Sequence, residues 1–159
     1  MSAVLALITV VVAIGIPLYI ANRQDKIALF EKRYKFFSAL IKCSSFARSI
    51  NNIQTNREVQ MFFIVSFSNR QLESDDSGTL QKMTTEMLCE CKNILDEGEF
   101  LFPFDTTAYT RPLVSSLFAL TTIKESHDNF WTFYSDFMKA EKISTEILVP
   151  KVKKALKLG

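Results

Sequence analysis

The sequence predicts an all-α protein in which a single N-terminal transmembrane helix continues into a cytoplasmic bundle of about five helices. Residues 2–21 are uncharged and mostly apolar, which is the first observation behind this prediction. The second is that apolar residues recur at helical spacing over long stretches of the remaining chain. The third is that the 159 residues include only four Gly and four Pro, fewer turn signals than a β-sandwich needs.

The apolar N-terminal run has the length of a membrane span. Twenty helical residues cover about 30 Å, the thickness of a bilayer's hydrocarbon core, so we expect residues 1–22 to form a transmembrane anchor. A cleaved signal peptide and a buried core helix are the alternatives. A signal peptide has basic residues before a shorter apolar run, whereas here the first basic side chain, Arg23, follows it. Pro17 should kink the helix near its end, which membrane helices tolerate.

Basic side chains are concentrated directly after the anchor. Residues 23–48 contain seven basic and two acidic residues, a net charge of +5, in a chain whose overall charge is +2. The positive-inside rule therefore places residues 23–159 in the cytoplasm and the N-terminus outside the inner (plasma) membrane. The overall charge is too small to indicate a nucleic-acid partner. We expect anionic lipid headgroups to attract the basic side chains nearest the anchor, namely Arg23, Lys26, Lys32, Arg33 and Lys35.

The anchor is expected to run without a break into a basic juxtamembrane helix, residues 23–50. No Gly or Pro interrupts residues 21–51, and Ile27, Phe30 and Tyr34 recur at helical spacing. The bundle, residues 55–148, then begins with a helix over residues 56–70. Its central MFFIVSF segment also fits a β-strand, because these residues are strand formers.

Three further helices complete the predicted bundle. One runs from Thr79 until Gly98 ends it, and Asp105 is the expected N-cap of the next. A long helix over residues 126–148 should be broken by Pro150. The last helix, residues 150–158, is basic and amphipathic, as membrane-surface helices are, although a solvated C-terminal turn is the alternative.

No group of side chains in the sequence matches a known catalytic or metal-binding pattern. Ser126, His127 and Asp128 are the residue types of a catalytic triad, but neighbours on a helix point about 100° apart and cannot bond to one another in that way. Cys89 and Cys91 lie on opposite sides of a helix, and no second cysteine pair supplies the spacing of a zinc site. Motifs for nucleotide phosphates are absent. We expect no catalytic, cofactor or metal residues, and no small-molecule substrate.

Aromatic residues are the candidates for contact with a partner protein. The run from residue 130 to residue 137 wraps more than one helix face, so part of it should be core and any exposed part should bind protein. A second aromatic group lies in the segment before Asp105. The candidate partner-binding residues are Trp131, Tyr134, Phe100 and Phe102.

The segment KIALFEKRY, Lys26 to Tyr34, together with the later Phe100-Leu101-Phe102, resembles a loose family of small bacterial membrane proteins. Their N-terminal transmembrane segments are followed by a similar amphipathic helix and a similar FLF segment. The resemblance implies membrane topology and a helical fold but no reaction, because most members are uncharacterised. This chain departs from the family in continuing with Pro103 where a Gly and an acidic stretch are usual.

These patterns together predict a protein that is not an enzyme. We expect a scaffold or regulatory protein at the inner face of a bacterial membrane, in contact with lipid and with a protein partner or a second copy of itself. The alternative is a stress- or phage-response effector that perturbs the membrane when its anchors assemble.

Overall fold

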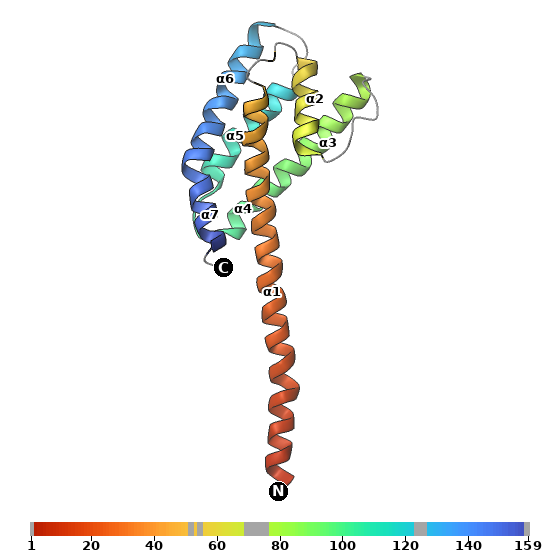
Figure 1. The fold of residues 1–159 in the computed structure, drawn as a ribbon, viewed down its shortest axis with the longest axis vertical. Helices are drawn as coiled ribbons and strands as arrows, with labels where there is room; N and C mark the ends of the chain where they lie inside the picture. Colours follow the sequence, from red (N-terminus) through yellow and green to blue (C-terminus); the bar gives the residue numbers. More distant parts are fainter. Residues whose placement is uncertain (1, 51–52, 54–55, 69–76, 123–126, 158–159) are drawn as a thin grey trace.

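The computed structural model describes the backbone of residues 2–50, 53, 56–68, 77–122 and 127–157. Side chains are described for residues 15–50, 53, 57–68, 78–122 and 130–157. Every element within these ranges is helical, so the all-α prediction is confirmed for this part of the chain (Figure 1).

The longest element is α1 (Ser2–Ser49), a single helix that starts far from the body and ends inside it (Figure 1). The predicted continuity between residues 2–21 and the first basic helix is confirmed. Helical backbone also continues through Pro17. All side chains from residue 15 to residue 32 are exposed, whereas Phe36, Leu40 and Cys43 are buried. The C-terminal part of α1 is therefore the central helix of the bundle. The part before it projects from the bundle.

Within the part of the chain that the structure describes, no helix combines the length and the apolarity required to cross a membrane. The predicted anchor, residues 1–22, lies largely outside the described side chains, which begin at residue 15.

The body packs around the C-terminal part of α1. Here α2 (Asn56–Phe67), α3 (Ser77–Asp96), α6 (His127–Ile143) and α7 (Val149–Lys157) all contact α1, while α5 (Thr107–Thr122) packs mainly along α6. At the centre the ring of Phe46 lies 5.4 Å from that of Phe63 and 5.6 Å from that of Phe137. Because these rings come from α1, α2 and α6, edge-to-face contacts join three helices at one point.

The alternative strand over residues 61–67 is excluded, since these residues belong to α2. Val59, Phe63 and Ile64 are completely buried, and their spacing of four and five residues puts them on one helix face. Phe62 and Val65 lie exposed on the other side. The apolar circumference of this helix is therefore only partly covered by the bundle.

A close approach between two helices shapes the turn after α3. The predicted end at Gly98 needs correction, because α3 ends at Asp96 and Gly98 begins the short helix α4 (Gly98–Leu101). A β-carbon at Gly98 would overlap the ring of Phe36 and would lie 2.9 Å from the Thr106 hydroxyl. Glycine is required here for space, because Phe36 of α1 fills the position that a side chain would occupy.

The predicted cap of the next helix is confirmed. One carboxylate oxygen of Asp105 accepts hydrogen bonds from the Thr107 amide at 2.8 Å, the Thr107 hydroxyl at 2.7 Å and the Ala108 amide at 3.3 Å. These bonds satisfy donors that the first turn of α5 leaves open.

Pro150 does not break the chain's last long helix, contrary to the prediction. The helix continues from α6 through a π-helical turn, η1 (Ser144–Leu148), into α7. In η1 the amide of Val149 donates to the carbonyl of Ser144, five residues earlier. This wider turn directly precedes Pro150, where an α-helix would meet both a missing donor and a ring clash, so it lets the helix accommodate the proline.

Candidate functional site

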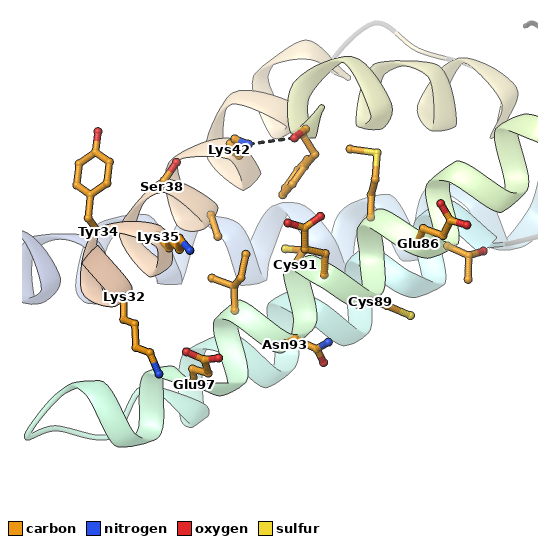
Figure 2. A pocket seen from close by; sticks show the side chains of 16 residues that line it. Lys32, Tyr34, Lys35, Ser38, Lys42, Glu86, Cys89, Cys91, Asn93 and Glu97 are labelled. Carbon is orange, nitrogen blue, oxygen red and sulfur yellow. Dashed lines mark hydrogen bonds between the residues drawn. The ribbon is translucent and has the colours of Figure 1, made fainter. Parts of the chain in front are cut away.

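An open groove of about 870 Å³ lies between α1 and α3 (Figure 2). Its α1 wall contains the exposed part of the basic helix and its α3 wall contains acidic and thiol side chains, as Figure 2 shows. The charged residues are Lys32, Lys35 and Lys42 on α1, Glu86 and Glu90 on α3, and Glu97 directly after α3. The groove thus offers both signs of charge along one channel, and such a surface suits a polar partner segment better than a small anion.

The ends of the groove differ. Lys42 donates a hydrogen bond of 3.0 Å to the carbonyl of Phe67, the last residue of α2, and so closes one end. At the other end Lys32 and Glu97 extend toward the same opening (Figure 2).

Cys89 and Cys91 both line the groove, and Cys91 belongs with Cys43 to the core as well. Cys89 is exposed on α3, whereas Cys91 is buried and approaches α1. The hydrogen bond that Cys43 makes with the Cys91 thiol, together with burial, holds the pKa of Cys43 well above its ordinary value. Cys43 is therefore a neutral thiol at pH 7, a state that packs like a small apolar side chain rather than reacting as a nucleophile.

No cluster of three or more His, Cys, Asp and Glu side chains that could hold a metal ion occurs among the described residues. The side chains of Ser126, His127 and Asp128 fall outside the described ones.

Trp131 and Tyr134 form an aromatic surface on the outside of α6, which we call the aromatic ledge. Trp131 is 58% exposed, and its ring lies 5.8 Å from that of Tyr134, which is half-buried. Phe130 is buried beneath them and anchors the ledge to the core. Met138, Lys139 and Lys142 extend it along the helix around a shallow hollow of about 570 Å³. The sequence reasoning placed Trp131 and Tyr134 as partner-binding candidates, and the structure brings them together.

The two phenylalanines of the FLF segment have opposite environments. Phe100 is 86% exposed on α4, whereas Phe102 is only 5% exposed, so the prediction of a partner-binding role for Phe102 is corrected. Its ring packs 5.1 Å from Phe36 of α1 and 5.3 Å from Phe104. Phe102 is buried because α1 covers the side of the turn from which it extends.

Arg33 also differs from its predicted lipid-facing role. Its Nε donates a 2.8 Å hydrogen bond to the carbonyl of Leu101, and its guanidinium lies 5.5 Å from the centre of the Phe102 ring. These two contacts tie α1 to α4 and leave the guanidinium directed into the body. Among the other candidates, Arg23 and Lys26 lie on the projecting part of α1, and Lys32 and Lys35 line the groove.

A partly buried polar cluster that sequence reasoning did not find joins α1 to the π-helical turn. The hydroxyl of Ser44 donates to Oε1 of Glu141 at 2.5 Å, and that of Thr145 donates to the same oxygen at 2.6 Å. The two hydroxyls lie 3.0 Å apart. Only the four-residue spacing of Glu141 and Thr145 is visible in the sequence, because Ser44 is about a hundred residues away.

The structure is a helical bundle built on one long projecting helix, with an open groove between α1 and α3 and exposed aromatic surface on α6. The groove and the hollow on α6 are both open to solvent. Comparison with protein-family models, with curated proteins and with solved structures finds no match for this chain.

Proposed function

We propose that this chain is a membrane-anchored interaction protein whose helical body is held at the inner face of the membrane and binds a protein partner there. The observation that carries the proposal is the unbroken helix α1, which places the N-terminal apolar run and the bundle on one continuous rod. Motion of the body relative to the bilayer is then limited by a stiff connection rather than a flexible linker.

The exposed side chains near the start of the described part support anchoring. Ile16, Leu18, Tyr19 and Ile20 are all exposed, each by 47% or more. Apolar surface of this kind is stable when lipid or another protein covers it. Arg23 and Lys26 follow at once, where a cytoplasmic headgroup region would attract them.

The anchoring step is tested by extracting membranes that contain the full-length chain with alkaline carbonate. Replacing Val11 and Val12 by Arg puts two charges in the centre of the apolar run, each costing about 3 kcal/mol in a membrane helix. We expect the unchanged chain to stay in the pellet and the doubly substituted chain to move to the supernatant. Val65→Arg is the control, because Val65 lies on an exposed face of α2 and the added charge stays in water. A buried valine such as Val59 would not serve, because a charge there would disrupt the core. Equal extraction of all three chains contradicts anchoring.

The binding step is tested at the aromatic ledge. A photo-crosslinking amino acid at Trp131 should give a discrete adduct in intact cells, because this side chain is exposed beside a hollow. The neighbouring exposed residue Thr132 is the matched control and should give none. Equal labelling at both positions, or none at either, contradicts a binding role for the ledge.

Overexpression separates this proposal from a membrane-perturbing effector. Growth arrest that requires residues 2–21 but not Trp131 would favour the effector, whereas unchanged growth agrees with a scaffold.

A further inference from the structure

An exposed apolar stripe runs along α1 from its projecting part into the part that packs in the bundle. Its side chains are 41–57% exposed although all are large and apolar. We call this set the α1 stripe, and it consists of Ile16, Ile20, Ile27, Phe30, Tyr34 and Ile41.

The stripe lies on a single face of the helix. Its members are three, four or seven residues apart, the spacing that keeps side chains in line on a helix paired with another helix. The bundle covers the other side, where Phe36, Leu40, Cys43 and Ala47 are buried. At 100° per residue these two sets point in nearly opposite directions. Two polar residues also lie in this line, Arg23 between Ile20 and Ile27 and Ser38 between Tyr34 and Ile41.

We propose that the α1 stripe binds the same stripe of a second copy of this chain, so that two α1 helices form a parallel two-stranded coiled coil. Ile27, Tyr34 and Ile41 are seven residues apart and therefore take the a position of three successive heptads. Phe30, three residues after Ile27, takes the d position, which is the other apolar position of a heptad. The helix pair would then have two copies of each side chain meeting across the axis. The bodies would lie outside the pair, since they occupy the opposite face of α1.

The charges beside the stripe are complementary in this arrangement. Lys26 directly precedes Ile27, and Glu31 directly follows Phe30, so the two flank the stripe on opposite sides. In a parallel pair, the residue in the place of Lys26 faces the residue five positions later on the other helix, which is Glu31 of the second copy. Twofold symmetry makes two such pairs. No salt bridge within the described residues uses either side chain.

A lipid bilayer cannot cover the whole α1 stripe. From Ile16 to Ile41 the helix is about 38 Å long, and under the proposed anchoring only its beginning lies near the hydrocarbon. The remainder stands away from the surface, where a second helix can reach it and lipid cannot. The parallel orientation rests on the proposed function, because both copies then leave one membrane in the same direction. The spacing of the stripe does not depend on it, whereas the Lys26–Glu31 pairs require the parallel orientation.

Cysteine crosslinking in membranes tests the contact with the full-length chain. In a Cys89→Ser background, which removes the exposed native thiol, Tyr34→Cys is compared with Lys35→Cys on the adjacent exposed position. Air oxidation with a copper catalyst joins two thiols only when their α-carbons come within about 7 Å. We expect a covalent dimer to form about tenfold faster from Tyr34→Cys, because paired positions meet that limit and Lys35 lies about 100° round the helix. Equal rates, or no dimer from Tyr34→Cys, would overturn the proposal.

Charge exchange gives a second, non-covalent test. Energy transfer between labelled copies in vesicles should show that Lys26→Glu and Glu31→Lys each weaken association about fivefold, by placing like charges together at two symmetric sites. The double variant Lys26→Glu/Glu31→Lys should restore it. A double variant as weak as the single ones overturns the pairing. Carbonate extraction of the same samples reports anchoring separately, so loss of dimer in chains that stay in the membrane counts against the dimer alone.

Discussion

The burial and the contacts of several single residues in this protein depend on side chains from distant parts of the chain. Arg33 and Phe102 illustrate this, since each was expected at a surface and each contacts the other inside the body. Gly98 is a further case, because the ring of Phe36, more than sixty residues earlier, occupies the space of its missing side chain. Substitutions at such positions test the packing directly.

Gly98→Ala is expected to destabilise the body. The added methyl group would overlap the Phe36 ring, and relieving an overpacked contact of this kind costs about 1–3 kcal/mol. Chemical denaturation of the full-length chain in detergent, followed by Trp131 fluorescence, measures the free energy of unfolding. Gly15→Ala is the matched control: nothing lies within 4 Å of its added carbon, so we expect no loss of stability. An equal loss in both variants would contradict the packing described.

Asp105 is expected to make stability depend on pH in acid. The hydrogen bonds from the Thr107 hydroxyl and the Ala108 amide lower the pKa of Asp105 below its ordinary value. A lowered pKa in the folded state means that the contribution is complete above the unfolded value of about 4 and is lost as pH falls through the folded one. Asp105→Asn keeps a cap acceptor but cannot titrate, so its unfolding free energy should fall less steeply below about pH 4.

The same titration has an internal control. Thr107→Val removes the largest cause of the lowered pKa while leaving the carboxylate, so its acid slope should lie between those of the unchanged chain and Asp105→Asn. Identical slopes for all three chains would show that this cap does not contribute.

Among the helices, the contact between α1 and the end of α6 with η1 depends on polar contacts as well as on apolar packing. The Ser44, Glu141 and Thr145 cluster sits where the helix widens before Pro150. A π-helical turn is less regular than an α-turn, and hydrogen bonds from its side chains to a neighbouring helix help to hold it in one arrangement.

Ser44→Ala is therefore expected to lower the free energy of unfolding by about 1–2 kcal/mol, because it removes a hydrogen bond to a carboxylate in a partly buried site. Ser49→Ala on the same helix is the control. Its hydroxyl donates only to the carbonyl of Ser45 at the surface, so the change should stay within about 0.5 kcal/mol. If Ser44→Ala and Ser49→Ala lower the free energy of unfolding equally, the hydrogen bonds of the cluster do not stabilise the fold.

For the whole molecule, the two parts of α1 have different roles although the helix is continuous. The part before about residue 33 is exposed on all sides, and the part after it forms the centre of the bundle (Figure 1). The body should therefore keep its stability when the projecting part is altered, while any contact between copies should be lost.

Proline placed in each part distinguishes these roles. Ala39→Pro breaks α1 where it is buried, and we expect a loss of about 3 kcal/mol or more in the unfolding of the body. Ala28→Pro lies in the exposed part and should leave that unfolding transition within about 0.5 kcal/mol of the unchanged chain. Trp131 fluorescence during denaturation reports the body in both cases. A large loss from Ala28→Pro would mean that the projecting part stabilises the bundle.

The sequence by itself determined the helical nature of the chain, the continuity of α1 and the cap at Asp105. These features depend on apolar periodicity, on the absence of Gly and Pro from residues 21–51 and on a side chain that bonds to its near neighbours, all of which are local. Only the tertiary structure decided that Phe102 is buried while Phe100 is exposed, that Arg33 is bound within the body and that a wide turn carries the helix past Pro150. The physical reason is that burial and hydrogen-bond partners are set by which helix covers a given face, and in this molecule the covering helix is often α1, far away in the sequence.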